Sequence, residues 1–436
     1  MSLDLLTSND TQGTYPASYY AATADPLPPF PKAAGTLTCD VCVVGGGFTG
    51  LSAAYHLARK GYDVTLLDAQ RVGFGASGRN GGQVGTGQRM DMDALAKLVG
   101  AGPAQILWDL SLESVQLVRD LITENAMDVP CHAGIIEAAH KPGLVADYHA
   151  YADHLTETYH YDQISKLDRD AMRAHVGSPA YHGGTLDMGG FHIHPLRYAL
   201  GLAQLAQTSG VRIFENSKVT SVEHKTPATV KTEAGATVTA GHVILAGNGY
   251  LGGLDRSVAK RVMPINNFIA ATAPLDDATA KGLIRDNHAV ADSKFVINYF
   301  RLSDDNRMLF GGGESYGYRF PNDIAAVVRK PMTAIFPQLK NVQIDYAWGG
   351  TLGITLNRMP HFARLSGNVL SAGGYSGHGV AMATLGGKLA AEAIAGQAER
   401  FDVMANVPTP AFPGGAALRW PLLVAGMIWY GLRDRL

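Results

Sequence analysis

The chain is poor in cysteine and has no excess of charge of either sign. Its 436 residues include 3 cysteines, and 36 Lys and Arg stand against 38 Asp and Glu, which gives a formal net charge of -2. So few cysteines exclude a disulfide framework. The balanced charge gives no electrostatic reason to expect a nucleic acid as partner. We therefore expect a folded protein that binds small molecules, with roughly two or three domains from its length.

Metal-binding patterns are also sparse. Cys39 and Cys42 form a C-x-x-C pair, but Cys42 lies in the apolar run DVCVV and no second cysteine pair completes a zinc site. We interpret this pair as structural. His192 and His194 have a spacing that suits a metal, yet no third ligand is evident nearby. The sequence therefore predicts no metal site.

Long apolar runs are missing as well. The N-terminus has no basic region followed by an apolar core, so we expect no secretory signal. The most membrane-like segment, 421–432, is shorter than the roughly 20 residues that span a bilayer. A packed helix, a subunit contact or a peripheral membrane anchor would each account for it. The chain is expected to be cytoplasmic.

A glycine turn between a strand and a helix is the first positive signal. TCDVCVV is typical of a strand buried on both faces, and LSAAYHLARKG has helical periodicity. Between them Gly45, Gly47 and Gly50 form G-x-G-x-x-G, in which the glycines permit a tight bend, close approach of a pyrophosphate and helix–strand packing. Asp68 ends the next strand, where a carboxylate can bind a ribose hydroxyl. We predict a site for FAD or NAD, and the carboxylate disfavours NADP.

A second glycine-rich stretch, GFGASGRNGG at 73–82, favours FAD. It follows Asp68 within a few residues, where an NAD-binding domain would begin another crossover. Ser77, Arg79 and Asn80 supply hydrogen-bonding groups, and the glycines allow a large planar ligand to come close. A flexible active-site lid is the alternative explanation.

Together these motifs resemble the D-amino-acid oxidase-like flavoproteins, which include glycine and sarcosine oxidases. The resemblance implies an α/β (α+β) fold with a Rossmann-like FAD-binding domain and a mixed-sheet substrate-binding domain. It implies a discontinuous FAD-binding domain at 36–90, 170–255 and 340–400, and a substrate-binding domain at 91–169 and 256–339. Residues 1–35 and 401–436 would be terminal extensions, the second with an apolar helix.

The same resemblance assigns the cofactor contacts. The residues expected to bind FAD are Gly45, Gly47, Phe48, Thr49, Gly50, Asp68, Ala69, Gly75, Ala76, Ser77, Arg79, Asn80, Gly81, Gly82, Val219, Gly247, Gly374, Ser376, Gly377, His378 and Gly379. Some family members attach FAD covalently, through a histidine in the second motif or a cysteine late in the chain. Here that motif has no histidine and no cysteine follows Cys131. We predict FAD bound without a covalent bond.

The activity implied by the resemblance is oxidation of an amine. A hydride leaves the carbon beside the nitrogen, water hydrolyses the imine to aldehyde and ammonia, and oxygen becomes hydrogen peroxide. The expected substrate is γ-glutamylputrescine or a related polyamine derivative, as in bacterial putrescine degradation. The alternatives are oxidation of a cyclic or N-substituted amino acid such as pipecolate, proline or sarcosine, and a flavin-binding subunit without turnover of its own.

Four residues are predicted to line the substrate site. Arg301 would grip a substrate carboxylate through two hydrogen bonds, and Tyr299, Trp348 and His378 would surround the amine. The alternative for Arg301 is a surface arginine without a ligand. The alternative for Tyr299, Trp348 and His378 is a role as core side chains.

One difference from related proteins leaves two electron acceptors possible, oxygen or another molecule. Sarcosine-oxidase-like relatives place a lysine near the flavin to promote reaction with oxygen, whereas the comparable segment VMPINNFIAAT has Asn266 and Asn267. A dehydrogenase that passes its electrons to another acceptor is the alternative.

Overall fold

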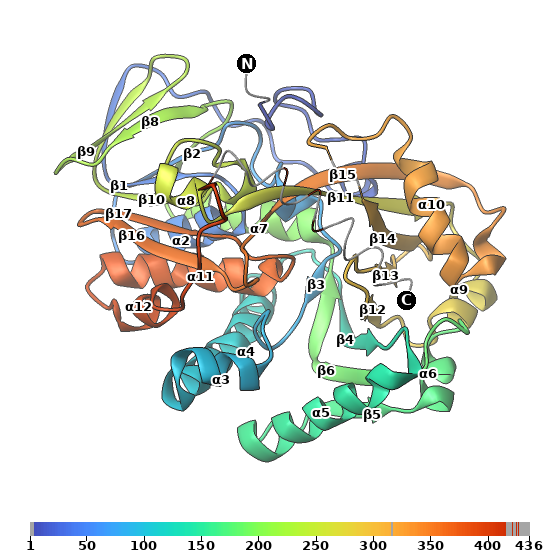
Figure 1. The fold of residues 1–436 in the computed structure, drawn as a ribbon. Helices are drawn as coiled ribbons and strands as arrows, with labels where there is room; N and C mark the ends of the chain where they lie inside the picture. Colours follow the sequence, from blue (N-terminus) through green and yellow to red (C-terminus); the bar gives the residue numbers. More distant parts are fainter. Residues whose placement is uncertain (1–3, 315–316, 416–420, 422–423, 425, 427–436) are drawn as a thin grey trace.

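The computed structural model describes residues 4–314, 317–415, 421, 424 and 426, and its elements form two sheets with helices around them (Figure 1). The apolar segment predicted at 421–432 lies almost wholly outside the described residues. None of the helices in the described ranges combines the length and hydropathy needed to span a bilayer.

The first sheet, on the left of Figure 1, has a parallel centre with the order β16-β17-β10-β1-β2-β7. Its strands are β1 (Thr36–Val44), β2 (Val64–Leu67), β7 (Arg212–Phe214), β10 (Thr237–Leu245), β16 (His361–Ser366) and β17 (Val369–Gly373), and β8 (Val219–Glu223) and β9 (Ala228–Thr232) extend it.

Strand β1 is buried on both faces at its end. Val41 and Val43 belong to one apolar core, and Cys42 and Val44 to another. The prediction of a buried strand is confirmed, and Cys42 is a packed side chain. Helix α2 (Phe48–Arg59) follows β1 and packs between α7 (Pro195–Thr208) and α11 (Gly379–Ile394), with α12 (Glu399–Ala405) beside α11.

The second sheet is mixed, with the order β15-β11-β14-β13-β12-β4-β6-β3 and β5 paired to β6. Its strands are β3 (Gln83–Val84), β4 (Cys131–Ala138), β5 (Ile164–Leu167), β6 (Gly184–Ile193), β11 (Met263–Thr272), β12 (Ala289–Asp292), β13 (Tyr299–Leu302), β14 (Met308–Glu314) and β15 (Ile344–Ile354).

Strand register gives this sheet two different faces. Val290, Phe300 and Phe310 pair across three strands, and their side chains fill an apolar core. That core is closed by α6 (Arg169–His175), α9 (Asp277–Leu283) and α10 (Ile324–Ile335). Ile269 and Trp348 point to the opposite face and join the core of the first sheet's helices. The second face is therefore turned toward the glycine motifs.

The remaining elements cover the edges. They are α1 (Tyr19–Thr23), α3 (Met92–Val99), α4 (Ala101–Glu124), α5 (Val145–Tyr159), α8 (Arg256–Ala259), η1 (Ala76–Gly78), η2 (Pro142–Leu144), η3 (Asn248–Tyr250) and η4 (Pro337–Leu339).

The expected fold class is confirmed, but three strands pair differently from the expected boundaries. β3, β6 and β15 hydrogen-bond within the second sheet, although 36–90, 170–255 and 340–400 grouped them with the first. Their antiparallel partners are distant in sequence, so no local pattern reveals the pairing. The division into domains otherwise stays a prediction.

Candidate functional site

The first glycine turn joins β1 to α2 and has no room for side chains. Gly45 has a φ of +111°, and a Cβ there would lie 2.8 Å from the Ala246 carbonyl oxygen. A Cβ on Gly47 would lie 2.8 Å from Ser77 Oγ, and one on Gly50 would lie 1.8 Å from the Gly45 carbonyl oxygen. The positive φ of Gly45 fits the predicted tight bend, and the close approach of a pyrophosphate at Gly47 remains a prediction.

The two glycine motifs meet at the start of α2. Phe48 N donates a hydrogen bond of 3.0 Å to Ser77 Oγ, so the second motif satisfies one of the N–H groups that a helix N-terminus leaves free. This end of the helix carries partial positive charge, which suits a phosphate.

Asp68 lies directly after β2. One of its carboxylate oxygens accepts from Gly46 N at 2.6 Å and the other from Gln70 N at 2.7 Å. Burial raises the pKa of Asp68 to about 6, although the two backbone donors act in the opposite direction. Each oxygen keeps acceptor capacity for a ribose hydroxyl.

Arg79 anchors the second motif from inside the protein. Its Nη1 lies 3.0 Å from each carboxylate oxygen of Asp10 and donates to the Gly349 carbonyl oxygen at 3.1 Å. Its Nε donates to the carbonyl oxygen of Phe74, whose ring centre lies 4.3 Å from the guanidinium carbon. Nη2 is buried without a partner among the described residues. It is the nitrogen left to meet a ligand.

Asn80 holds the loop of the second motif closed. Its Nδ2 donates to the carbonyl oxygens of Ala76 and Ser77 at 3.0 and 2.9 Å, and its Oδ1 accepts from Gly82 N at 2.7 Å. These bonds leave its side chain few groups for a flavin.

Gly81 and Gly82 lie where the second motif touches the second sheet. A Cβ on Gly81 would lie 2.7 Å from the ring of Tyr299, and one on Gly82 would lie 2.1 Å from the Ile193 carbonyl oxygen. Tyr299 is partly exposed, and its hydroxyl donates to Asn267 Oδ1 at 2.5 Å. Of the four predicted substrate residues, Tyr299 has the position that best fits the prediction.

Arg301 does not fit the role expected for it. Its side chain is buried, and Nε donates to the Gly81 carbonyl oxygen at 2.8 Å. Nη2 donates to Ile193 O and Tyr20 Oη, and Nη1 to Leu302 O. With both sides of the guanidinium engaged by protein oxygens, no free pair of N–H groups faces a substrate carboxylate. The sequence could not show that these distant acceptors converge here.

Trp348 is likewise a packing residue. It is buried, its Nε1 donates to the Arg79 carbonyl oxygen at 3.0 Å, and its ring lies edge-on to Tyr20 at 5.2 Å. Its contribution is to press the second motif against the sheet.

The third glycine-rich turn, 374–379, precedes α11. Gly374 has a φ of +71° and Ser376 a φ of +53°, and the hydroxyl of Ser376 donates to the Gly374 carbonyl oxygen at 3.1 Å. Gly377 has a φ of +90°, and Gly379 is the first residue of the helix. The positive end of a 16-residue helix is therefore placed at this turn.

His378 links this turn to the chain that follows the second motif. Its Nε2 lies 3.1 Å from the Gly87 carbonyl oxygen, and a Cβ on Gly85 would lie 3.2 Å from its ring. Burial lowers the pKa of His378 to about 4, so the imidazole is neutral at pH 7. Since Nε2 donates to the Gly87 carbonyl oxygen, Nδ1 of the neutral ring is an acceptor toward any ligand.

The remaining predicted FAD contacts lie in turns and element ends. Thr49 is in the first turn of α2, Ala69 follows Asp68, Gly75 precedes η1 and Ala76 begins it, Gly247 precedes η3, and Val219 begins β8.

The two histidines considered as metal ligands have other partners. His194 accepts from Arg197 N at the start of α7, and His192 Nε2 lies 2.7 Å from the Asn287 carbonyl oxygen. Among the described residues, a different group has ligand spacing. It consists of His175, Asp286 and His288, and Asp286 pairs with Arg285 at 2.6 Å. The sequence did not predict it because His175 is far along the chain from Asp286 and His288.

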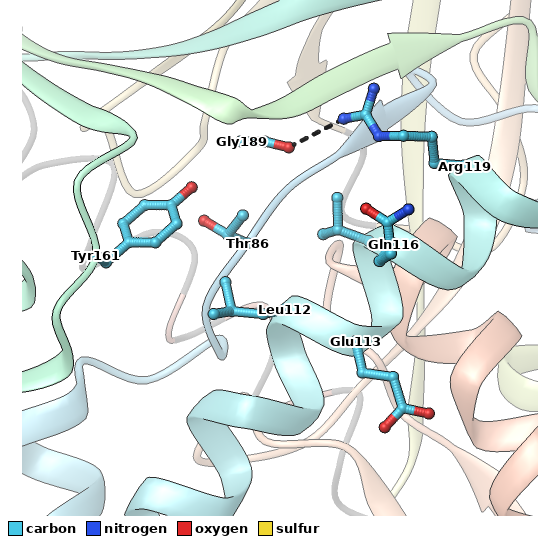
Figure 2. A pocket seen from close by; sticks show the side chains of 8 residues that line it. Thr86, Leu112, Glu113, Gln116, Arg119, Tyr161 and Gly189 are labelled. Carbon is cyan, nitrogen blue, oxygen red and sulfur yellow. Dashed lines mark hydrogen bonds between the residues drawn. The ribbon is translucent and has the colours of Figure 1, made fainter.

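A pocket of about 340 Å³ lies beside α4 (Figure 2). Glu113, Arg119 and Tyr161 line it, and Arg119 reaches the Gly189 carbonyl oxygen at 3.4 Å. None of the residues predicted to bind FAD or substrate contributes to its lining. We therefore place the candidate site at the glycine motifs instead.

Comparison with known proteins identifies the family of the chain. The family described as "FAD dependent oxidoreductase" matches residues 40–393. The chain belongs to this family. It is 44% identical to gamma-glutamylputrescine oxidoreductase of Escherichia coli over 96% of this chain and 98% of that protein. It is 42% identical to the probable oxidoreductase OrdL of Rhizobium meliloti over 96% of this chain and 97% of that protein.

Solved structures of other flavoenzymes share the fold of this FAD-dependent oxidoreductase. Glycine oxidase from Geobacillus kaustophilus superposes with a TM-score of 0.69 at 19% identity, over 83% of this chain and 95% of that chain. L-proline dehydrogenase from P. horikoshii superposes with a TM-score of 0.68 at 20% identity, over 86% of this chain and 96% of that chain.

The residues of this FAD-dependent oxidoreductase fit its cofactor. The glycine turn keeps a tight, side-chain-free backbone directly before the N-terminus of α2, where N–H groups suit a phosphate. Asp68 keeps free acceptor capacity and Arg79 Nη2 is an unpartnered buried donor. The absence of a covalent bond to FAD remains a prediction.

Proposed function

We propose that this FAD-dependent oxidoreductase oxidises the carbon beside the nitrogen of an amine, with γ-glutamylputrescine or a related polyamine derivative as substrate. One observation carries the proposal: the second glycine motif packs directly on Tyr299, so flavin and substrate can meet at this face of the second sheet. The extensive similarity to the Escherichia coli enzyme supports the choice of substrate.

Bound FAD would accept the hydride that leaves the carbon, and the protein would supply binding and orientation. Gly45, Gly47 and the start of α2 would hold the pyrophosphate, and Asp68 the ribose. The N-terminus of α11 would favour negative charge beside it. Tyr299 would pack against the amine and help to exclude water.

Oxygen is our first candidate for the electron acceptor, with hydrogen peroxide as product. A second candidate is favoured by Asn267, an uncharged side chain that accepts from Tyr299 and stands in the segment where sarcosine-oxidase-like relatives carry a lysine. In that case the enzyme would be a dehydrogenase with another acceptor, and its substrate could be a cyclic amino acid such as pipecolate or proline. For either reaction we propose a cytoplasmic enzyme.

The test is anaerobic. Purified yellow protein is mixed with γ-glutamylputrescine, then separately with putrescine, pipecolate, proline and sarcosine, and the visible flavin absorption is followed before air is admitted. N-acetylated γ-glutamylputrescine, which lacks the free terminal amine, is the matched control. We expect bleaching by γ-glutamylputrescine alone, followed by recovery in air with hydrogen peroxide.

The other outcomes are distinct. Bleaching that does not recover in air would favour a dehydrogenase. Bleaching by pipecolate or proline alone would replace the proposed substrate, and no bleaching by any amine would contradict amine oxidation. Acid precipitation of the same sample tests the cofactor bond, because non-covalent FAD stays in the supernatant.

A further inference from the structure

Glu137 shares a sheet face with Tyr299. Glu137 of β4 pairs with Ala291 of β12, and Ala291 pairs with Tyr299 of β13. Paired residues point to the same side of a sheet, whereas Ile136 and Phe300 point into the apolar core on the other side. Adjacent strands lie about 4.8 Å apart, so Glu137 and Tyr299 are separated by about 10 Å of sheet. Only the methyl group of Ala291 lies between them in this row.

The second glycine motif crosses this face from β13 to β12. Gly81 lies against the ring of Tyr299, and two residues later Gln83 Nε2 donates to the Val290 carbonyl oxygen of β12 at 3.1 Å. The chain that is expected to contact FAD therefore runs toward β4.

Farther along, the same chain reaches β4 beside Glu137. A Cβ on Gly85 would lie 3.6 Å from Ile135 and 3.2 Å from the ring of His378. Ile135 precedes Glu137 by two positions in the strand, so their side chains share a face. Glu137 thus lies where the second motif, the 374–379 turn and the second sheet come together.

Glu137 is a carboxylate without a partner. No described residue forms a hydrogen bond or ion pair with its side chain. Burial raises the pKa of Glu137 to about 7, Arg89 acts to lower it, and Asp292 and Asp187 act to raise it. Tyr148 of α5 also faces this carboxylate.

Two neighbouring carboxylates, Asp187 and Asp292, each have hydrogen-bond donors within the protein. Asp187 accepts from Thr86 Oγ1 at 2.5 Å and from Gly189 N at 2.9 Å. Asp292 accepts from both the backbone and the side-chain nitrogen of Asn298. Glu137 is partly exposed on this face and has no such donors, so its carboxylate is open to a ligand.

We propose that Glu137 binds the ammonium group of the substrate amine and takes one proton from it before oxidation. The inference rests on the proposed amine oxidation and assigns to it a catalytic residue. Arg89 acts on this carboxylate only through its charge, and its Nε donates to the Ser376 carbonyl oxygen at 3.0 Å. The substrate's ammonium group would be the missing counter-charge.

The proposed step is a proton transfer and involves no oxidation. An N–H bond of R–CH₂–NH₃⁺ breaks, the proton joins an Oε atom of Glu137, and R–CH₂–NH₂ keeps the electron pair on nitrogen. That pair is needed to stabilise the positive charge that develops when the neighbouring carbon loses a hydride. A carboxyl with a pKa near neutrality is better matched to this transfer than an ordinary glutamate.

The experiment measures binding of an amine that cannot react. tert-Butylamine has no hydrogen on the carbon beside nitrogen, and tert-butyl alcohol is its uncharged isostere. Their dissociation constants are taken from the flavin spectrum of the oxidised, FAD-loaded protein for wild type, Glu137→Gln and Glu137→Asp. Glu113→Gln is the matched control, since that carboxylate is half-buried and bound by Lys388 and Arg400.

We expect wild type and E113Q to prefer the amine over the alcohol at least tenfold, E137D to keep part of this preference, and E137Q to lose it. Anaerobic flavin reduction by γ-glutamylputrescine at pH 7 should fall by about 10²-fold or more in E137Q. In wild type, tert-butylamine binding should weaken as Glu137 is protonated below about pH 7.

Equal preference for the amine in E137Q and wild type would overturn the ammonium site, and equal reduction rates would overturn the proton transfer. If E137Q failed to hold FAD, wild-type binding that stays constant from about pH 6 to about pH 9 would overturn the proposal. Amine binding that depends on Glu137 without flavin reduction by any amine would support the ammonium site and contradict the proposed oxidation.

Discussion

The first and second glycine motifs are both rich in glycine, yet they are built in different ways. At Gly45 and Gly50 the closest atoms are backbone, the Ala246 and Gly45 carbonyl oxygens, and at Gly47 the closest atom is Ser77 Oγ. At 73–82 the shape depends on buried side chains, above all Arg79 and Arg301, whose partners come from distant parts of the chain. The first turn is therefore packed mainly against backbone, whereas the shape of the second depends on buried side chains that reach across the fold.

The N-terminal extension, residues 1–35, contacts the two arginines that shape the second motif. Asp10 pairs with Arg79, and Tyr20 is fully buried and accepts from Arg301. A segment that precedes the first strand thus holds the second motif in place. Changes far from the second motif should therefore disturb it through these side chains, whereas the first turn should respond most to an added Cβ.

The largest effect is expected from breaking the buried ion pair. Arg79→Met leaves Asp10 buried without its counter-charge, which should cost about 3–5 kcal/mol of unfolding free energy. Lys166→Met breaks an exposed pair with Asp153 and should cost less than about 1 kcal/mol. Thermal unfolding of the FAD-loaded variants measures both. Equal small losses would show that Arg79 is dispensable.

A Cβ in the first turn should have the next largest effect. Gly50→Ala would put a carbon 1.8 Å from the Gly45 carbonyl oxygen, so α2 must move. The free energy of unfolding should fall by about 3 kcal/mol, and FAD binding should weaken. Gly102→Ala, in open space on α4, is the control and should be neutral. The ratio of flavin to protein absorbance reports FAD content. Normal FAD content in Gly50→Ala would refute the close packing of this turn.

Arg301→Lys distinguishes support of the loop from substrate binding. A lysine cannot make all of the bonds to Gly81, Ile193 and Tyr20, so about 1–3 kcal/mol of stability should be lost. We expect FAD retention to fall while KM for γ-glutamylputrescine stays nearly constant. A large rise in KM at unchanged stability would restore the carboxylate-binding role.

The smallest effect is a pH dependence at Asp68. Its pKa in the folded protein without FAD is about 6, above the usual 3.8, so the folded state binds this proton more tightly than the unfolded chain. FAD binding that needs the ionised carboxylate should be constant above pH 6 and weaken by up to about tenfold per pH unit below it. Titration of the apoprotein with FAD measures this. Asp68→Asn should remove the slope, and an identical slope in that variant would assign it to another group.

The sequence predicted best those features that are set by residues close together in the chain. The β1–turn–α2 unit, the buried Cys42 and the acidic end of β2 follow from local residue order. Arg301 and Trp348 were assigned to substrate because the sequence cannot show that their partners are Gly81 and Arg79. Glu137 was missed, although a single carboxylate within the apolar strand AGIIEAAH was an available signal.

The central claim is that flavin and amine meet between the second glycine motif and the Glu137–Tyr299 face. A crystal structure of the FAD-loaded protein with bound tert-butylamine tests it most directly. We predict a flavin ring beside 81–83 and a ligand nitrogen within hydrogen-bond distance of Glu137. A ligand nitrogen bound elsewhere, such as beside Glu113 in the pocket along α4, would contradict the claim.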